Sequence, residues 1–395
     1  MNSSDPVVIL SAARTPIGGL LGALSTVKAT DLGATAVKAA LQRGGVDPQL
    51  ADKIFMGCVL PAGLGQAPAR QVGVAAGLPL RTEATTINKM CGSGMQAVIL
   101  AHDTLAAGSA ELVVAGGIES MSNAPYLLAK HRTGARIGHD LLKDSMYLDG
   151  LEDAYEPGKL MGVFAEAAAK EYGFSREAQD AYAAESLTWA QAAIAKGTFR
   201  EEIAPVAVTT RKGIEQVAID EQPGKGSVDR IATLKPAFSA DGTITAANAS
   251  SISDGAAALV VTRTSVARRL GVSPLARIVA HAAHAQQPGL FTSAPVPAMR
   301  KVLALAGWSA DAVGLYEVNE AFAVVAMIAM RELNIPRNRL NVNGGACALG
   351  HPIGASGARI LVTLLAALKA RGETRGVASL CIGGGEATAM AVELL

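Results

Sequence analysis

The chain has 395 residues, of which 50% are hydrophobic and 17% charged, with 35 basic and 34 acidic side chains. This length predicts two or three packed units instead of one simple core. The near-neutral charge excludes a long-range attraction to nucleic acid or to an anionic membrane, so any anion site must be local.

The N-terminus shows no secretory or transit peptide, because polar residues 1–5 lead directly into a strand-like run, Val7–Ser11. Ala321–Met330, taken as the longest apolar stretch of the C-terminal half, is far shorter than the roughly 20 residues that a membrane-spanning helix needs. The cysteines form no C-x-x-C pair, so neither a zinc site nor a disulfide framework is indicated. They are Cys58, Cys91, Cys347 and Cys381. We therefore expect a reduced, cytoplasmic protein.

Strand-like and helix-like segments alternate along the chain, which is typical of an α/β fold. After the first strand, a helix is predicted over Asp31–Gln42, with Thr30 or Asp31 as its N-cap. Buried strands are predicted at Lys53–Met56 and at Leu112–Ala115.

Two stretches of the chain share one order of parts. In the first, Cys91 and a Gly-Ser-Gly turn precede an apolar helix that ends at Gly108, and a strand with two glycines follows. In the second, Ala355–Gly357 open an apolar helix that Gly372 ends, and Val377–Ile382 leads into three glycines. This order favours a duplicated domain. The alternative is that glycine-bounded helix–strand units recur by chance in any α/β protein.

Charged and turn residues become more frequent between residues 122 and 236, around a long amphipathic helix pattern at Phe174–Lys196. This shift in composition predicts an insertion carried on the first half, and such insertions often build substrate sites. A solvated connecting region is the alternative interpretation.

Cys91 is the first candidate for chemistry, because it stands directly before a predicted helix in the segment Asn-Lys-Met-Cys-Gly-Ser-Gly. The unpaired N–H groups and positive end of that helix favour a thiolate. The glycines let a bulky acyl group approach the backbone, and a thiolate accepts acyl groups well. A buried structural cysteine is the alternative, since this is the commonest fate of a free cysteine.

Three segments of the C-terminal half carry further candidates. His351 lies on a glycine-rich turn stiffened by the following proline, where it can take the proton from Cys91. Cys381 ends an apparent buried strand before three glycines, whose N–H groups can bind an oxyanion. Asn319 and Glu320, taken alone, are interpreted as a helix cap and its first-turn acid.

Together these segments resemble the signature set of the thiolase family. The matching segments are Cys91-Gly-Ser-Gly, Asn319-Glu-Ala-Phe, Gly350-His-Pro-Ile-Gly-Ala-Ser-Gly and Cys381-Ile-Gly-Gly-Gly, with Ser11-Ala-Ala-Arg-Thr-Pro, Val59-Leu-Pro-Ala-Gly, Gly116-Gly-Ile-Glu-Ser-Met and Thr245-Ala-Ala-Asn-Ala-Ser. The resemblance implies an α/β fold in which two βαβαβαββ halves stack as five layers, α/β/α/β/α, with an inserted loop domain. We expect the N-terminal half at 1–121 and 251–272, the CoA-binding loop domain at 122–250, and the C-terminal half at 273–395.

The resemblance also implies a role for each candidate. Cys91 attacks the acyl thioester, and His351 activates its thiol. Cys381 moves the proton at the α-carbon of acetyl-CoA. Asn319, through a water, shares with His351 an oxyanion site for the enolate. The backbone N–H groups of Cys91 and Gly383 form a second oxyanion site, for the tetrahedral intermediates. No metal and no bound organic cofactor is implied, because coenzyme A is substrate and product.

Contacts with the acyl group and CoA are implied for nine residues, which are Leu160, Met161, Arg230, Phe238, Ala246, Ser250, Phe291, Ala321 and Phe322. Lys225 and Lys235 are further candidates for the phosphate end of CoA. The chain departs from the family where Leu160 replaces a histidine common in short-chain members, and where Phe291 replaces a frequent methionine. Further departures, at Gly224, Ala247 and Ser251, also bear on the substrate more than on the reaction.

The expected activity is that of an acyl-CoA:acetyl-CoA C-acyltransferase. It interconverts two acetyl-CoA with acetoacetyl-CoA plus CoA by ping-pong Claisen chemistry through an acyl-Cys91 intermediate. The alternatives are a 3-ketoacyl-CoA thiolase of broader chain length, a ketoacyl synthase, which needs a second catalytic histidine, and a non-catalytic acyl-CoA or lipid carrier on the same scaffold. We expect a role in fatty acid metabolism, a homodimer or homotetramer, and neither a nucleic-acid nor a membrane partner.

Overall fold

The structure is a computed structural model that describes residues 5–395. Its strands are β1 (Val7–Arg14), β2 (Gly18–Gly19), β3 (Lys53–Gly57), β4 (Glu83–Ile87), β5 (Leu112–Ser120), β6 (Tyr126–Leu127), β7 (Lys143–Asp144), β8 (Val206–Thr210), β9 (Gly213–Val217), β10 (Ser253–Arg263), β11 (Ala276–Ala285), β12 (Leu315–Val318), β13 (Arg375–Ile382) and β14 (Glu386–Leu394). Its α-helices are α1 (Ala29–Arg43), α2 (Pro68–Ala76), α3 (Ser93–Ala106), α4 (Met161–Glu171), α5 (Arg176–Lys196), α6 (Glu221–Lys225), α7 (Thr264–Leu270), α8 (Pro295–Ala306), α9 (Ala323–Leu333), α10 (Ala346–Leu349) and α11 (Ile353–Arg371).

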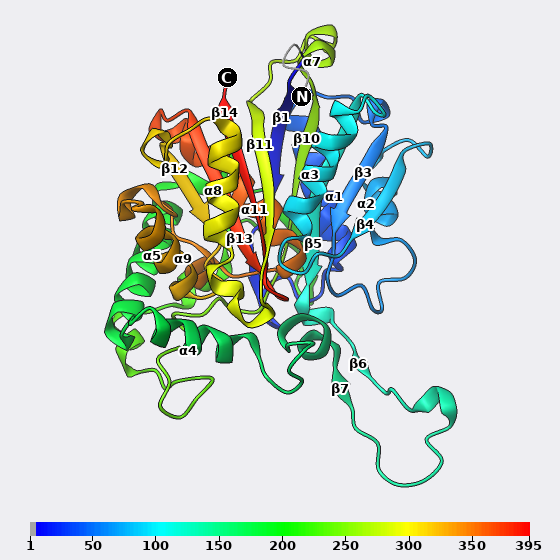
Figure 1. The fold of residues 1–395 in the computed structure, drawn as a ribbon. Helices are drawn as coiled ribbons and strands as arrows, with labels where there is room; N and C mark the ends of the chain where they lie inside the picture. The colour runs from blue at the N-terminus through cyan, green and yellow to red at the C-terminus, as the bar shows by residue number, and fades with distance from the viewer. Residues whose placement is uncertain (1–4) are drawn as a thin grey trace.

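One ten-stranded mixed sheet runs through the molecule in the order β12-β13-β14-β11-β1-β10-β5-β3-β4, with β2 beside β10 (Figure 1). From the central pair of β1 and β11 outward, the two sides of the sheet have the same arrangement of strands. β1, β10, β5 and β3 follow one another on one side, and β11, β14, β13 and β12 do so on the other, with the same parallel and antiparallel pairings. β4 completes the first half, whereas a single bridge between Tyr316 and Leu340 marks its counterpart. The duplicated α/β halves predicted from the sequence are therefore present.

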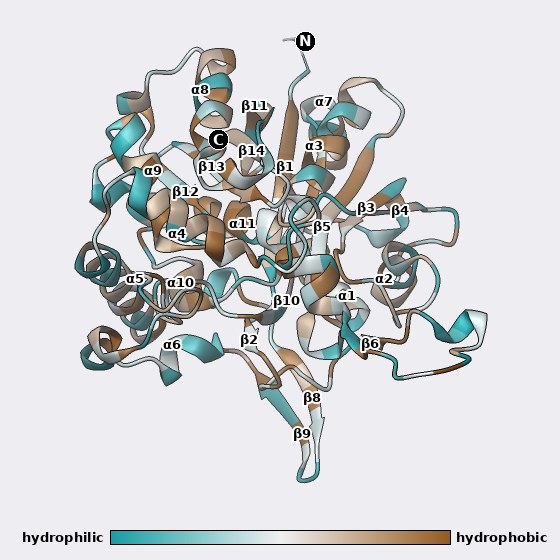
Figure 2. Ribbon diagram, turned by 60° about the horizontal axis from the view of Figure 1, so that its bottom comes forward, coloured by the Kyte–Doolittle hydropathy of each residue, from teal (hydrophilic) through white to brown (hydrophobic). Residues whose placement is uncertain are grey.

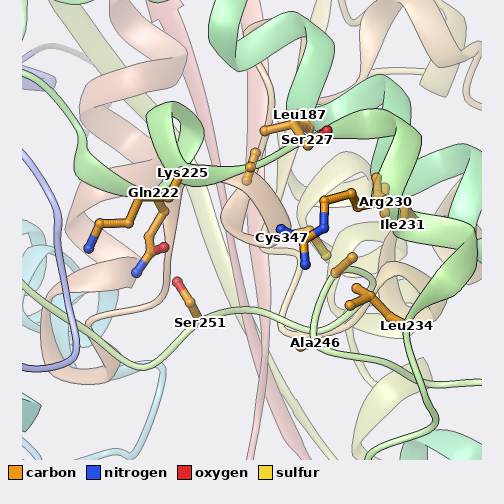
Figure 3. A pocket seen from close by; sticks show the side chains of 14 residues that line it. Leu187, Gln222, Lys225, Ser227, Arg230, Ile231, Leu234, Ala246, Ser251 and Cys347 are labelled. Atoms are coloured by element: carbon orange, nitrogen blue, oxygen red, sulfur yellow. The ribbon is translucent and has the colours of Figure 1, made fainter.

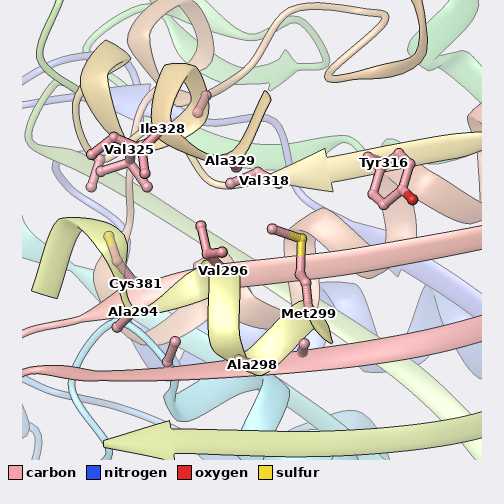
Figure 4. Close-up of a cluster of buried hydrophobic side chains, with 14 of the residues drawn as sticks. Ala294, Val296, Ala298, Met299, Tyr316, Val318, Val325, Ile328, Ala329 and Cys381 are labelled. Atoms are coloured by element: carbon pink, nitrogen blue, oxygen red, sulfur yellow. The ribbon is translucent and has the colours of Figure 1, made fainter. Parts of the chain in front are cut away.

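Helices separate the two halves into layers. α1 and α2 cover the outer face of the N-terminal half, while α8 and α9 pack on the C-terminal half around the core of Figure 4. α3 and α11 cross between them, and their side chains share one core with strands of both halves. Their backbones approach closely at Gly94 and Gly357, where a Cβ atom would come within 2.8 Å of Ala358 N and 2.4 Å of Met95 N respectively. The N-termini of both helices consequently meet at the middle of the molecule.

The segment between β5 and β10 forms the predicted insertion, and its helices pack against the C-terminal half. α5 contacts α9 and α10, and α4 contacts α9 and the 3₁₀ segment Pro288–Ser293. The hairpin of β8 and β9 projects from the body in Figure 2, and the segment carrying β6 and β7 extends away in Figure 1. The domain boundaries at residues 121, 250 and 272 remain predictions.

One described helix, α11, is long and apolar enough to cross a membrane by length and composition, with 83% of its apolar window buried inside the protein. Ala321–Met330 is therefore not the longest apolar segment of the C-terminal half, contrary to the prediction. Because α11 packs between the two halves of the sheet, its hydrophobicity is explained by its central place in the core.

Two predicted helix caps are wrong. α1 begins at Ala29 with Lys28 in the N-cap position, so Thr30 and Asp31 lie inside the first turn, where the Asp31 carboxylate complements the helix dipole. α9 begins only at Ala323. Asn319 and Glu320 therefore do not cap α9. Both side chains are buried and bonded to other parts of the chain, and Glu320 accepts the N–H of Cys347 in the first turn of α10.

Candidate active site

The backbone before α3 presents Cys91 at the junction of the two halves. Met90 adopts φ 45°, a left-handed conformation that few side chains favour, and Asn88 Oδ1 accepts its N–H at 3.0 Å. Ser93 Oγ accepts the N–H of Lys89 at 2.8 Å. A Cβ atom at Gly92 would lie 2.3 Å from Ile382 Cδ1 of the other half, so any larger residue there would have to displace this side chain. This tight turn aims Cys91 across the interface between the halves.

The Cys91 thiol is protonated at rest, contrary to the thiolate expected from the helix start. Burial raises its pKa to about 11, although the N–H groups of Gly383 and of Cys91 itself act in the opposite direction. Loss of solvation thus outweighs the helix terminus and the local N–H donors. Nucleophilic attack by Cys91 therefore needs a base to take the thiol proton. The same N–H groups lie close enough to the sulfur to donate hydrogen bonds to an oxyanion formed beside it.

His351 has the protonation state of such a base. Burial, reinforced by the charge of Arg359, lowers its pKa to about 3, so the imidazole is neutral at pH 7. The Ser356 hydroxyl donates its hydrogen to Pro352 O at 2.9 Å and lies 2.6 Å from His351 Nδ1. Nδ1 must therefore donate to Ser356 Oγ, which leaves a lone pair on Nε2 for a proton.

Asn319 is held against this ring by a buried arginine. Its Nδ2 lies 3.4 Å from His351 Nδ1 and 3.5 Å from Nε2, and its Oδ1 accepts a hydrogen bond from Arg359 at 3.3 Å. Arg359 is only 2% exposed, and Glu317 approaches it to 3.8 Å. Burial raises the pKa of Glu317 to about 8, although the Arg359 charge lowers it. Arg359 thus holds the Asn319 amide from the side away from the cavity.

Cys381 is the last residue but one of β13 and is almost completely buried, at the edge of the core shown in Figure 4. Burial, and then the neighbouring charge of an ionised Cys91, raises its pKa well above the ordinary value. A thiol in this state is a proton donor, and the thiolate left after donation is a strong base.

A cavity of about 500 Å³ brings four of the five predicted catalytic groups together. Cys91, His351, Cys381 and Gly383 all line it, whereas Asn319 contacts the His351 ring from outside the lining. Its wall also contains eight of the nine residues predicted to contact the acyl group and CoA, which are Leu160, Met161, Phe238, Ala246, Ser250, Phe291, Ala321 and Phe322. Phe322 lies edge-on to both Phe238 and Phe291, which makes this wall mainly apolar.

A second cavity of about 240 Å³ adjoins the first, since Ala246 and Ser251 line both. The ninth predicted contact, Arg230, lines this recess of the inserted segment (Figure 3). Lys225 lines it too, although its Nζ forms an ion pair with Glu221. Lys235 lies outside the lining of both cavities. Positive charge at the outer cavity and apolar groups at the inner one match a long ligand with an anionic end and a thioester end.

Glu119 belongs to one of the matching motifs but was not predicted to have a role of its own, yet its carboxylate ties together three segments of the chain. Its carboxylate accepts the N–H groups of Val59 at 3.1 Å, Leu60 at 3.2 Å and Gly354 at 2.8 Å. Burial raises its pKa to about 7, although these N–H groups lower it. Since Gly354 lies in the first turn of α11, three residues after His351, the carboxylate fixes the two halves relative to each other.

Other functional positions were missed because no local pattern marks them. Ser356 was within reach of sequence reasoning, since it follows His351 on the same turn, whereas Arg359 needs the fold to bring it to Asn319. The cavity wall includes further residues that were not predicted as contacts, which are Met90, Tyr147, Gly150, Leu151, Gly162, Ala237, Thr245, Ala249, Ser251, Ile252 and Ile353.

The duplicated fold, with one cysteine from the first half facing a histidine and a second cysteine from the other half, defines a protein built for thiol-based acyl transfer. Family models agree with this class along nearly the whole chain. "Thiolase, N-terminal domain" matches residues 7–265, and "Thiolase, C-terminal domain" matches residues 272–394. The chain belongs to the thiolase family.

Its relatives share nearly their full length with it. The acetyl-CoA acetyltransferase of Thiocystis violacea is 49% identical over 99% of this chain and 100% of its own. That of Cupriavidus necator is 50% identical over 98% and 99%, and the cytosolic enzyme of Mus musculus is 49% identical over 99% and 98%. Among solved structures, the Acat5 thiolase of Ascaris suum in complex with coenzyme A superposes with a TM-score of 0.94, at 41% identity, over 99% of this chain and 100% of that chain.

Proposed function

We propose that this chain is an acetyl-CoA C-acetyltransferase that interconverts two acetyl-CoA with acetoacetyl-CoA plus CoA. The observation that carries the proposal is the single cavity lined by Cys91, His351, Cys381 and Gly383, next to a recess with two basic side chains. The names of the full-length relatives and the coenzyme A bound in the Ascaris suum structure support it.

Cleavage begins at Cys91. His351 Nε2 takes the thiol proton, and the sulfur attacks the 3-keto carbon of the substrate. The N–H groups of Cys91 and Gly383, which lie close to the sulfur, stabilise the alkoxide that forms. This alkoxide collapses to a thioester on Cys91 as the bond between C2 and C3 breaks.

The carbanion of acetyl-CoA then needs a proton, which the Cys381 thiol supplies. Its raised pKa keeps this thiol protonated until that step. His351 and Asn319 stabilise the enolate oxygen, with the amide held by Arg359. Acetyl-CoA leaves, and Cys381 remains as a thiolate.

Free CoA completes the cycle. Its thiol gives a proton to the Cys381 thiolate and attacks the acyl group on Cys91. The second tetrahedral alkoxide uses the same two N–H groups, and the Cys91 sulfur leaves with the proton that His351 has held. Each group returns to its starting state, so the reaction is a ping-pong exchange that reverses for synthesis.

The Cys91 role is tested with radioactive acetyl-CoA. The wild-type chain should become labelled on Cys91, as located by peptide mapping, and Cys91→Ser should not. Labelling of Cys91→Ser at the wild-type level would remove Cys91 as the nucleophile, and it would also reopen the non-catalytic carrier as an alternative.

The length of the acyl chain that the enzyme accepts is a further part of the proposal. Leu160 and Phe291 replace polar or flexible side chains common in the family and both line the inner cavity, which favours an apolar acyl group alongside acetyl. Cleavage rates should be measured for 3-ketoacyl-CoA substrates of increasing length, with Leu160→His beside the wild type. A strict preference for the four-carbon substrate that Leu160→His leaves unchanged would exclude broader specificity.

Assembly and location remain parts of the proposal. Exposed apolar side chains gather on the segment that carries β6 and β7, at Tyr126, Leu128, Ile137, Leu141 and Leu142, and this supports a homo-oligomer. Light scattering on the purified protein distinguishes a dimer or tetramer from a monomer.

A cytoplasmic location and a role in fatty acid metabolism are tested by fractionation and by growth of a deletion strain on fatty acids.

A further inference from the structure

Three side chains that typically bind metal ions converge away from the active-site cavities. His102 and Asp103 lie near the C-terminal end of α3, and His281 lies on β11. His102 Nδ1 is 3.0 Å from Asp103 Oδ1, His281 Nε2 is 2.9 Å from the same oxygen, and the two nitrogens are 3.2 Å apart. None of the three lines either cavity described above.

The triangle has the size of one face of a tetrahedral zinc site. Zinc binds imidazole nitrogen and carboxylate oxygen at about 2.0–2.2 Å, which separates neighbouring ligand atoms by roughly 3.3 Å. The three observed separations fall within a few tenths of an ångström of this value. Two imidazoles and one carboxylate are also a ligand set that suits zinc and its neighbours among the divalent metals.

Hydrogen bonds alone satisfy this triangle poorly. A neutral imidazole has one N–H, and a carboxylate has none, so two N–H groups directed at Asp103 would face each other across the 3.2 Å between the nitrogens. His102 Nε2 and His281 Nδ1 make no hydrogen bond within residues 5–395. Each of these outer nitrogens can carry the proton, which leaves both inward nitrogens with lone pairs for a cation.

The three side chains of this triangle are exposed to solvent to different degrees, and this arrangement suits a bound ion. The His102 side chain is 7% exposed, His281 is 22% exposed, and Asp103 is 54% exposed. The two rings meet edge to face, with centroids 4.8 Å apart, so packing restrains them. The carboxylate side gives an ion a route from solvent and a free position for water.

The geometry points to a divalent transition-metal site at His102, Asp103 and His281, with Zn²⁺ as the fitting ion and water in its fourth position. This inference is independent of the proposed function. Because two ligands belong to α3 and one to β11, a bound ion clamps the helix that follows Cys91 to the first strand of the C-terminal half. It therefore stabilises the fold without taking part in acyl transfer.

The test uses the full-length protein after treatment with a chelator and its removal. Titration with Zn²⁺ in a calorimeter should show one ion per chain and a higher Tm. Co²⁺ should give visible d–d bands without a thiolate charge-transfer band, because the ligands are nitrogen and oxygen. A strong thiolate band would place the metal on the cysteines and overturn the inference.

Two variants remove ligands, and one serves as a matched control. His281→Ala and Asp103→Asn should each weaken Zn²⁺ binding by more than about 100-fold and abolish the gain in Tm. His284→Ala removes a histidine from the same strand and should bind like the wild type. Asp103→Asn keeps the side-chain shape at an exposed position, so it tests the site even if His281→Ala folds poorly.

Without added metal, Asp103→Asn and His281→Ala should keep wild-type acyl-transfer activity, since neither residue lines the active-site cavity. Wild-type Zn²⁺ affinity in both variants would overturn the inference, as would a wild-type protein that takes up no Zn²⁺.

Discussion

The ends of β5 and β13 occupy matching places in the two halves, yet they present opposite surfaces to the site. Each strand pairs with a parallel neighbour on one side and an antiparallel neighbour on the other. Near the end of β5, the Glu119 carboxylate takes up the N–H groups of three other residues. Beyond β13, Gly383 has no side chain, and its N–H faces the Cys91 sulfur.

This difference shows how the duplicated halves have divided their roles. In the N-terminal half, backbone donors around Glu119 are saturated by a buried carboxylate, so they fix structure. In the C-terminal half, the corresponding glycine turn keeps a donor free for an oxyanion, and Cys381 precedes it by two residues. In the proposed mechanism, the first half contributes the nucleophile and a rigid support, and the second contributes the proton-transfer groups.

The largest effect on activity is expected from a substitution at the end of β13. Cys381→Ala should lower the rate of 3-ketoacyl-CoA cleavage by about 10²–10⁴-fold, because the carbanion loses its proton donor. Labelling of Cys91 by acetyl-CoA should remain, and exchange of the α-deuterium of acetyl-CoA should become very slow.

The matched control is Cys58→Ala, which removes the buried cysteine whose thiol lies 3.8 Å from Glu119 in the N-terminal half. It should lower stability and leave most of the turnover intact. Normal α-deuterium exchange in Cys381→Ala, or an equal loss of turnover in both variants, would contradict the proposed division of roles.

Glu119→Gln should cost about 2–3 kcal/mol of unfolding free energy, because the new amide N–H groups would face backbone N–H groups that cannot turn away. Glu320→Gln is the matched change at a second buried carboxylate. Its carboxylate meets two fixed donors, Asn341 Nδ2 and the N–H of Cys347, against three at Glu119. Its other two partners are the hydroxyls of Tyr182 and Ser186, which can rotate to accept a hydrogen bond, so we expect a smaller loss. Urea denaturation measures both, and the reverse order of the two losses would refute the argument.

His351 should make the protein less stable in acid. Its pKa is about 3 in the folded chain against an ordinary 6.5, so the unfolded chain takes up the proton first as the pH falls. Folding stability is therefore lost between pH 6.5 and pH 3, with about 2 kcal/mol lost between pH 7 and pH 5. Urea midpoints at these two pH values should differ less in His351→Gln than in the wild type. Identical pH dependence in both would show that the imidazole is not kept neutral.

The smallest effect is expected at the rim of the site, where Lys89 Nζ lies 2.6 Å from Glu386 and ties the Cys91 turn to β14. Both side chains are partly exposed. Lys89→Met should therefore cost at most about 1 kcal/mol, and the loss should shrink at high salt. A larger loss that is independent of salt would assign Lys89 a role beyond this ion pair.

Much of the fold could be predicted from local sequence signals. Glycine-bounded helices after Cys91 and before Val377 indicated the duplication, because turn chemistry depends on neighbouring residues alone. The helix starts at Ala29 and Ala323 were missed, since Asp31 and Asn319 are common N-cap residue types whose actual positions depend on how the chain enters the helix. The nine predicted substrate contacts all line the two cavities, whereas Arg359 and Ser356 were not assigned.

The sequence by itself determined the family and the order of the four motifs, and it predicted the nucleophile and its partners, because these depend on residue types at fixed spacing. Only the tertiary structure decided their protonation states. The helix start predicted a thiolate at Cys91, but burial between the halves raises its pKa to about 11 and lowers that of His351 to about 3. Desolvation depends on everything packed around a group, and so does the meeting of His102 with His281, 179 residues away along the chain.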